Sequence, residues 1–540
     1  MRVLARYLIF ILVPAFCISF ALNAGQDINW DLQNYHLYAP YAFINARHLI
    51  DLSPAGLQSY FNPILYLAYF WLINHTSPQV SASILALIQS LNFFVVYGIA
   101  LQLLPEQRAK RYIALALALM GVLSVGFISE IGTTQFDNVV SLFILAALFL
   151  VLYAVNNCNG KRAKLYFLIG GFLAGIGCAV KLVVGVYALG LCVAIFCLSE
   201  TFRERFLLSC IYSSGVVIGI LLVGGFWFLF MFENFGNPLF PLFNSFFGSD
   251  LAQVASSRDM RFLPKGIVDY LAYPIVFTFS PRRVSGIAYA QYSWLIVYLA
   301  IVVFFLSKLF TFNKRFRSQD SLSEDKKLFL GFFIASYFLW LLLFGIYRYL
   351  VSLDLLIPLM IFIIFGTFFS NRLYRYGALI GLAGVTWINS SGAADWGRAG
   401  WSEQIYKTEI PVGFAEANKI VLVGQPLAWL IPAFNVTRPF IQIAPNYLVS
   451  ATYVNRVRDL VIDDGRLGII YSPNIRDIGA EIPADLIQQY FPQEIEISAE
   501  GPVTILQLFL EMGVEDFACE PFTANLGQTD YNFQFCLQKD

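Results

Sequence analysis

Residues 165–199 read LYFLIGGFLAGIGCAVKLVVGVYALGLCVAIFCLS, and this stretch decides the class of the fold. Its one charged residue is Lys181. A helix needs only about 20 residues to cross the ~30 Å hydrocarbon core of a bilayer, so the stretch is too long for one crossing. A single helix would also leave the Lys181 ammonium unpaired in lipid, which is costly. We therefore predict two membrane-spanning helices, 165–181 and 182–199, divided at Lys181.

Similar apolar runs lie on both sides of this stretch. They fall at 7–22, 80–104, 111–128, 138–155, 207–231, 292–312, 328–346, 350–370 and 376–390. Each is long enough, or nearly so, to cross a membrane. The first run also has the outline of a signal peptide, but the many later runs favour an uncleaved helix. The sequence thus predicts an all-α polytopic membrane domain of about eleven helices over residues 1–390.

The composition requires a lipid-facing surface. Of the 540 residues, 58% are hydrophobic and only 13% are charged, whereas soluble domains carry roughly 25% charged residues. A chain of this length cannot hide such an apolar excess in one core. The formal net charge is zero, so the chain lacks the basic field that binding of nucleic acid requires.

Basic residues gather in loops that fall on one face of this topology. They are Arg2, Arg6, Arg108, Lys110, Arg111, Lys161, Arg162, Lys164, Arg203, Arg205, Lys314, Arg315, Arg317, Lys326, Lys327, Arg372 and Arg375. The positive-inside rule makes this face, and the N-terminus, cytoplasmic. We expect a multi-pass protein of a bacterial-type inner membrane, with outer loops 23–79 and 232–291 and an extracytoplasmic tail, 391–540.

The tail differs in character from the rest of the chain. Lys419–Leu422 and Leu467–Tyr471 have the pattern of short strands, and Pro483–Tyr490 that of a short helix. We predict a soluble α/β domain over 391–540. Cys519 and Cys536 both lie in it, and a disulfide between them fits an oxidising compartment. The eight cysteines form no CxxC motif and no Cys/His cluster with zinc spacing.

The first outer loop carries the densest set of chemically active side chains. Asp31, Tyr35 and His36 follow the first apolar run directly, and all three histidines of the chain lie in this region. Partial desolvation at a membrane boundary raises the basicity of a carboxylate, which suits a general base. The alternative is that these are ordinary solvated loop residues. The spacing of the histidines matches no compact metal-ligand pattern.

This loop resembles that of the GT-C superfamily of membrane glycosyltransferases, which includes protein O-mannosyltransferases and the aminoarabinose transferases of lipid A. The similarity consists of Asp31-x-x-x-Tyr35 after one membrane helix, then Asn45-Ala46-Arg47, then Tyr60-Phe61-Asn62-Pro63 opening an apolar stretch at Ile64–Ile73. The sequence departs from the family pattern at Ala46, where glycine is common, and at Asn62-Pro63, which replaces a double proline. The resemblance implies a GT-C-like membrane domain and a polyprenyl-phosphate-linked sugar as donor.

The second outer turn, 129–137, supplies two further acids, Glu130 and Asp137. In the resembled family such a turn often carries a second acidic residue. Together with Tyr35 and His36, these acids could bind an acceptor or a divalent cation, the one cofactor that the sequence suggests. Asp137 could equally serve only as the N-cap of the next helix.

Several cations on the predicted outer face are candidates for binding the donor phosphate. Those residues, with one aromatic neighbour, are Lys181, Arg282, Arg283, Arg348 and Tyr349. Cations outside oppose the positive-inside trend and so call for an anionic partner. The competing explanations are a snorkelling Lys181, ordinary lipid headgroups for the arginines, and a structural pair between Arg348 and Asp354.

The sequence therefore favours a membrane glycosyltransferase that uses a polyprenyl-phosphate sugar, with Asp31 as the general base and a glycan, lipid or protein as acceptor. A surface-polysaccharide polymerase or ligase is close in chemistry. A secondary transporter would place its ionisable residues near mid-membrane, whereas most of those here crowd one boundary. A non-catalytic assembly factor would use the polar loop only to bind lipid.

Overall fold

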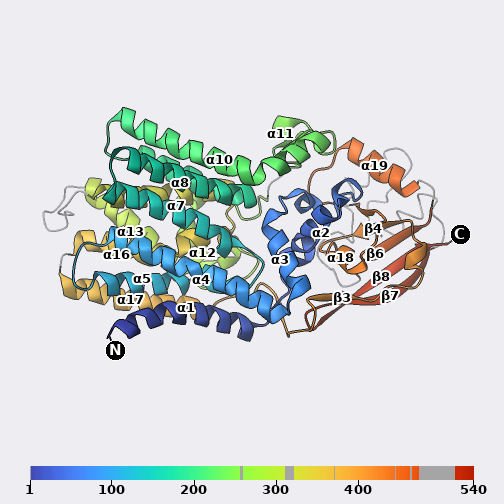
Figure 1. The fold of residues 1–540 in the computed structure, drawn as a ribbon, viewed down its shortest axis with the longest axis horizontal. Helices are drawn as coiled ribbons and strands as arrows, with labels where there is room; N and C mark the ends of the chain where they lie inside the picture. The colour runs from blue at the N-terminus through green and yellow to red at the C-terminus, as the bar shows by residue number, and fades with distance from the viewer. Residues whose placement is uncertain are drawn as a thin grey trace. The chain divides into compact units, whose positions relative to one another are not determined.

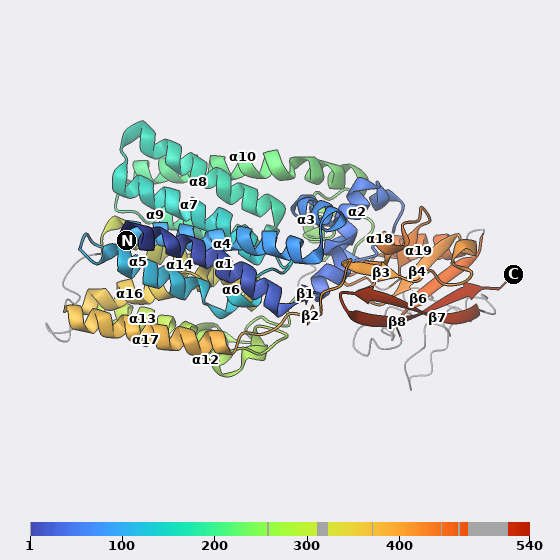
Figure 2. The ribbon, with the colours of Figure 1, turned by 60° about the horizontal axis from the view of Figure 1, so that its bottom comes forward.

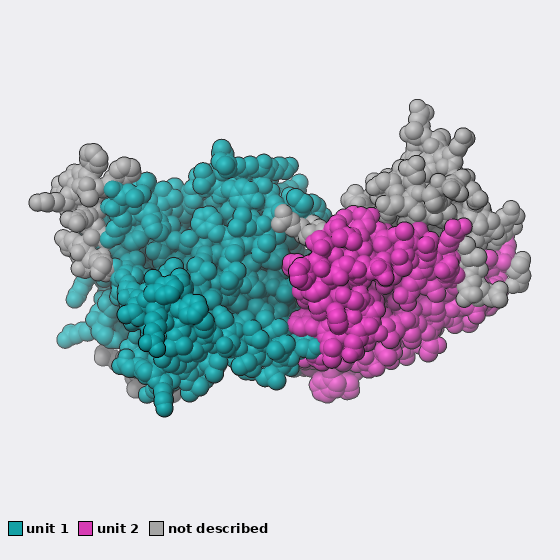
Figure 3. Space-filling model, turned by 90° about the horizontal axis from the view of Figure 1, so that it is seen from above, with its two compact units in different colours: residues 1–23, 82–225, 259–396 teal, residues 24–81, 226–258, 397–540 magenta. Residues whose placement is uncertain are grey.

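The computed structural model describes residues 2–255, 259–309, 322–369, 371–443, 445–462, 465–472 and 517–539. These form two compact units (Figure 3). The first consists of residues 1–23, 82–225 and 259–396, and the second of 24–81, 226–258 and 397–540. Much of the two predicted outer loops therefore belongs to the same compact unit as the predicted tail. The predicted helix Pro483–Tyr490 and the basic loop 314–317 lie outside the described residues.

The first unit is built of helices (Figure 1). They are α1 (Arg2–Ala24), α4 (Pro78–Leu103), α5 (Lys110–Val122), α6 (Val125–Ser129), α7 (Asp137–Asn157), α8 (Gly160–Val180), α9 (Gly185–Phe196), α10 (Phe202–Phe235), α12 (Ile267–Phe279), α13 (Tyr292–Leu309), α14 (Glu324–Leu343), α15 (Val351–Asp354), α16 (Ile357–Phe368) and α17 (Arg372–Ser391). The first turn of α4 and the end of α10, from Phe226 on, are counted with the second unit. The outward side chains of these helices are strongly apolar; Leu222 is 70% exposed and Ile380 75%. Such a surface requires lipid around it.

Six described helices are long and apolar enough to cross a membrane, namely α4, α7, α8, α10, α13 and α14. The turn Tyr347–Asp354 and α16, bent by 52°, would make a seventh span if taken together. The predicted number of eleven is not confirmed, because several apolar runs form shorter helices. The run 111–128 ends its first helix at Val122, and the run 182–199 gives a helix of only 12 residues.

The predicted break at Lys181 is confirmed. Helix α8 ends at Val180, and Lys181 has the extended conformation (φ −148°, ψ 105°). A single 3-10 turn, Leu182–Val184, then leads into α9. The break places the only charged side chain of this stretch at a helix end.

Two glycines of α8 lie against the backbone of α10. A Cβ at Gly171 would collide with the carbonyl oxygen of Tyr212, and one at Gly175 with that of Val216. Gly215 of α10 approaches the α8 backbone in the same way. Small residues on both helices thus allow their backbones to touch.

The second unit contains a six-stranded sheet (Figure 2). Its strands are β3 (Tyr406–Thr408), β4 (Lys419–Val423), β5 (Phe440–Gln442), β6 (Leu467–Tyr471), β7 (Phe517–Leu526) and β8 (Thr529–Gln538), in the order β3-β7-β8-β6-β4-β5. Strands β4, β5 and β6 are parallel, and the other pairs are antiparallel. A separate pair joins β1 (Gln26–Asp27) to β2 (Arg398–Ala399). The two predicted strands, now β4 and β6, are confirmed.

Short helices complete this unit: α2 (Tyr38–Ile44), α3 (Ile64–His75), α11 (Asn244–Phe247), α18 (Leu430–Phe434) and α19 (Ala451–Ile462). Residues of α18 pack on the sheet, with the Phe434 ring 5.9 Å from that of Phe522. The predicted disulfide between Cys519 and Cys536 is present and joins β7 to β8. The tail is thus the α/β fold that its sequence predicted.

A buried ion pair fastens the first outer loop to the sheet. Arg47 and Asp51 lie 2.6 Å apart and are almost fully buried. Asp51 also accepts a hydrogen bond from the backbone amide of Phe440 at 2.9 Å, and Arg47 donates to the carbonyl oxygen of Arg438. Ala46, directly before, has φ +52°. This left-handed conformation favours glycine.

Candidate functional site

A polar turn, residues 130–136, joins α6 to α7 in the first unit. Gln89 of α4 holds it: the Gln89 side-chain amide donates to the carbonyl oxygens of Glu130 (3.1 Å) and Thr133 (3.3 Å). The Gln89 side-chain oxygen accepts from the backbone amide of Gly132 at 2.6 Å. Gly132 has φ +73°, and a Cβ there would press on Ala21. Glycine at this position therefore lets the turn close against the helices.

Glu130 is fully buried at the start of this turn. The backbone amide of Asn138 donates to its Oε2 at 3.1 Å, while Oε1 has no hydrogen-bond partner among the described residues. Burial, and then the nearby Asp137 carboxylate, raise the pKa of Glu130 well above its usual range, against the opposing charges of Lys181 and Arg348. The environment thus favours the neutral acid, which can donate as well as accept a hydrogen bond.

Asp137 and Lys181 form a buried ion pair. Lys181 Nζ lies 2.5 Å from Asp137 Oδ1, and their side chains are 10% and 2% exposed. The ammonium also donates to the backbone carbonyl of Gln135 at 2.8 Å. Asp137 is the first residue of α7, and Phe136 holds the cap position. The capping explanation for Asp137 is therefore wrong, since its side chain makes no cap bond and turns to Lys181 instead.

Arg348 reaches the same turn from η6, the 3-10 turn Tyr347–Leu350. Its guanidinium donates to the side-chain oxygen of Gln135. Arg348 Cζ lies 5.1 Å from the centroid of the Tyr349 ring, and Lys181 Nζ lies 5.6 Å from the same centroid. The hydroxyl of Tyr187 bonds the Tyr349 carbonyl. Two cations therefore share one aromatic ring, held in place from α9.

Five of the predicted site residues thus come together, namely Glu130, Asp137, Lys181, Arg348 and Tyr349. Sequence reasoning missed Gln89 and Gln135, which connect them. Gln89 carried a signal, because it is a polar residue inside the apolar run 80–104. Gln135 carried none beyond its place in the polar turn.

The two arginines at 282 and 283 have other surroundings. Arg283 pairs with Asp269 of α12 at 2.7 Å, and Arg282 is exposed on the 3-10 turn Pro281–Arg283. Among the described residues, neither contacts the cluster around Lys181. The suggested pair between Arg348 and Asp354 is not formed among the described residues, where Asp354 instead accepts a hydrogen bond from Tyr347.

Asp31, Tyr35 and His36 lie in the second unit. Asp31 is 7% exposed and directly precedes η1, the π-helical segment Leu32–His36. The His36 ring stacks on that of Tyr66 with centroids 4.5 Å apart, and Tyr35 meets Tyr66 edge-on at 5.5 Å. The predicted catalytic carboxylate is thus buried, which does not fit the alternative of an ordinary solvated loop residue. Its approach to Lys181 stays a prediction.

A metal ion needs several ligand side chains close together. No set of three or more His, Cys, Asp and Glu side chains that could hold a metal ion occurs in the part of the chain that the structure describes. Glu130 and Asp137 offer two carboxylates, each with one oxygen that lacks a hydrogen-bond partner among these residues. The divalent cation stays a prediction.

No family model and no curated protein sequence matches the chain. Solved structures similar to it include two of ArnT from Cupriavidus metallidurans. The apo structure is 11% identical with a TM-score of 0.43, and the alignment covers 100% of this chain and 99% of ArnT. The structure bound to undecaprenyl phosphate is 11% identical with a TM-score of 0.42, covering 99% and 98%. The chain is similar to ArnT over its whole length, at low sequence identity.

Proposed function

We propose that this protein is an integral membrane glycosyltransferase that moves a sugar from a polyprenyl-phosphate donor to an acceptor at the outer face of the membrane. The observation that supports this most is the meeting of Lys181 and Arg348 on the ring of Tyr349. Both cations lie at the ends of apolar helices, where the phosphate of a membrane lipid would reach them. Charge-assisted hydrogen bonds to phosphate are the strongest that such side chains make.

The two cations suit different parts of that task. The guanidinium of Arg348 is a planar fork that matches two phosphate oxygens, whereas the ammonium of Lys181 is a compact point charge. An ammonium has three N–H donors, and Lys181 uses two of them on Asp137 and Gln135. The third is available to a ligand. The Tyr349 ring keeps both cations side by side.

Asp31 is the proposed general base. It would take the proton from the acceptor hydroxyl while that oxygen attacks the anomeric carbon. The bond from the anomeric carbon to the phosphate oxygen breaks, and the electron pair leaves on the polyprenyl phosphate. Glu130, Tyr35 and His36 would bind the acceptor.

The cysteines support an extracytoplasmic position for the second unit. Cys519 and Cys536 form its disulfide, and disulfides persist in oxidising compartments. The six free cysteines of the chain all belong to the first unit. We propose that the tail lies outside the cell membrane, on the side where the acceptor is bound.

The test uses Asp31→Asn and Arg348→Gln in proteoliposomes that contain polyprenyl-phosphate sugars. Loss of a general base lowers the rate by roughly 10²- to 10⁴-fold, so we expect Asp31→Asn to abolish transfer yet retain binding of polyprenyl phosphate. Arg348→Gln should weaken that binding. Transfer by a well-folded Asp31→Asn protein at the wild-type rate would refute the assigned base. Solute uptake into sealed vesicles without a new glycosidic bond would show a transporter instead.

A further inference from the structure

We propose that Asp354 is a positioning residue for the phosphate site: it fixes the turn that presents Arg348. The inference rests on the proposed function, because it gives Arg348 its role toward the lipid phosphate. Asp354 itself touches no part of that site. It acts through its neighbour Tyr347, the residue directly before Arg348.

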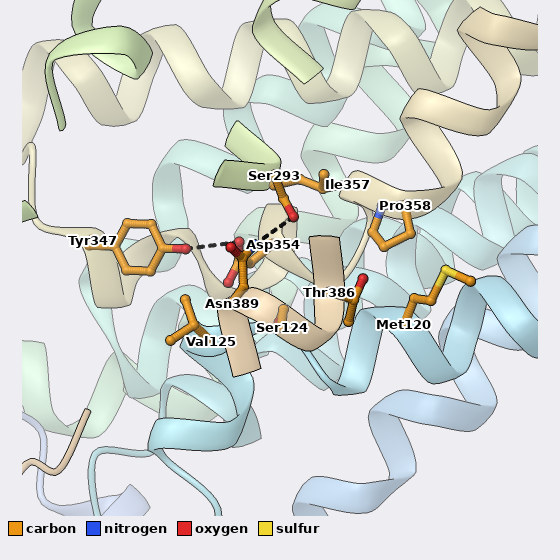
Figure 4. A pocket seen from close by; sticks show the side chains of 10 residues that line it. All are labelled: Met120, Ser124, Val125, Ser293, Tyr347, Asp354, Ile357, Pro358, Thr386 and Asn389. Atoms are coloured by element: carbon orange, nitrogen blue, oxygen red, sulfur yellow. Dashed lines mark hydrogen bonds between the residues drawn. The ribbon is translucent and has the colours of Figure 1, made fainter. Parts of the chain in front are cut away.

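Three donors from three elements converge on the Asp354 carboxylate. Oδ1 accepts from the Tyr347 hydroxyl at 3.1 Å and from Trp294 Nε1 at 3.0 Å. Oδ2 accepts from the backbone amide of Gly126 at 3.0 Å. Figure 4 shows the Tyr347 hydroxyl directed at this carboxylate. Because Asp354 is only 3% exposed, water has little access to compete for these three hydrogen bonds.

These contacts join the two halves of the candidate site. Tyr347 opens the turn η6 that carries Arg348, and Gly126 belongs to α6, which leads directly into Glu130. Trp294 lies on α13 and anchors the carboxylate from a third side. One side chain therefore sets the cation turn and the acid turn in register with each other.

Packing alone does not hold Asp354 in place. A small cavity lies beside it, lined in part by the polar side chains of Ser124, Ser293, Thr386 and Asn389 (Figure 4). Within the described part of the chain, Asp354 has no salt bridge, so all its donors are neutral. A buried carboxylate without a cation is costly. Its presence is accounted for if the three acceptor bonds serve to fix the Arg348 turn.

An amide cannot replace this carboxylate without conflict. A carboxylate only accepts hydrogen bonds, whereas an Asn side chain turns an NH₂ group toward one of the donors. Asp354→Asn should therefore loosen Tyr347 or Gly126. We expect it to weaken binding of decaprenyl phosphate roughly 2- to 30-fold, the usual range for a residue that acts through another.

A double-mutant cycle tests the inference. Binding of decaprenyl phosphate to the purified full-length protein in lipid nanodiscs is measured for wild type, Asp354→Asn, Arg348→Gln and the double variant. If Asp354 acts through Arg348, Asp354→Asn weakens binding in the wild type but adds no loss in the Arg348→Gln background. An equal loss in both backgrounds, or none in the single variant, would overturn the proposal.

A second cycle covers the case in which Asp354→Asn does not fold. Tyr347→Phe deletes only the hydroxyl that reaches Asp354, and it should show the same dependence on Arg348. Tyr212→Phe is the matched control, because it also removes one buried tyrosine hydroxyl, which bonds the Ala188 carbonyl, and it should leave binding unchanged. If Arg348→Gln binds like the wild type, the proposed function fails along with this inference. If Arg348→Gln is weak and the Tyr347→Phe loss simply adds to it, only the positioning role fails.

Discussion

Removing Lys181 should expose the cost of its buried ion pair. In Lys181→Gln, Asp137 would stay 98% buried beside the equally buried Glu130. Leaving one partner of a buried pair unpaired costs about 3–5 kcal/mol. Asp137→Asn should cost less, because the longer lysine can carry its ammonium toward water. Neutralising both partners in Lys181→Gln/Asp137→Asn should recover up to about 3 kcal/mol, the upper range of coupling for residues in contact.

The assay is unfolding of the purified protein by sodium dodecyl sulfate, followed with binding of decaprenyl phosphate. Lys327→Gln is the control, since its pair with Glu324 is more than a third exposed and exposed pairs contribute about 0–1 kcal/mol. We expect the double variant to regain stability but not lipid binding. A Lys181→Gln protein as stable as Lys327→Gln would refute the cost assigned to the pair. A double variant that binds the lipid normally would refute the phosphate contact of Lys181.

Three further predictions concern the second unit. Burial lowers the pKa of His48 from 6.5 to about 4. Between pH 6.5 and 4 the unfolded state therefore binds more protons than the folded state, and stability falls as the pH falls through this range. His48→Phe should remove this part of the pH dependence when the melting temperature is recorded from about pH 7 to 4. Ala46→Gly should stabilise by about 1 kcal/mol by relieving the exposed residue at φ +52°, and an unchanged or lower melting temperature would contradict this. Cys519→Ser opens a loop with a sequence separation of 17 and should cost about 3 kcal/mol, whereas equal stability with and without reductant in the wild type would show that the bond contributes nothing.

Features with a strong local cause could be predicted from the sequence. The break at Lys181 follows from the cost of an ammonium in lipid, and β4 and β6 follow from short apolar runs in a polar tail. The Cys519–Cys536 disulfide could be predicted because the tail contains only these two cysteines. In each case one term dominates the free energy, so few alternatives compete.

The predicted number of spans is not confirmed, because the length of an apolar run is not the length of a helix. The run 111–128 divides between α5 and α6, and the run 350–370 bends between Asp354 and Ile357. Both breaks lie near Asp354, whose carboxylate bonds the amide of Gly126. Hydropathy contains no information about such a tertiary contact.

The site was predicted in part for the same kind of reason. Topology alone puts Lys181, Arg348 and the turn 130–136 on one face, and their contacts confirm it. The partner of Arg283 could not be read, because Asp269 lies 14 residues away and any nearby acid was an equal candidate. Gln89 and Gln135 were missed because the role of a neutral side-chain amide depends on its tertiary contacts, which the sequence does not show.

The glycine contacts between α8 and α10 have a consequence for how the cation site responds to a ligand. Because the backbones of α8 and α10 pack closely at Gly171 and Gly175, there is little space there for a side chain of α8 to turn toward α10. The backbone of Lys181 directly follows the last residue of this closely packed helix. If Lys181 binds the lipid phosphate as proposed, the remaining N–H of its ammonium can reach the ligand by changes in the lysine side-chain torsions, without a movement of α8.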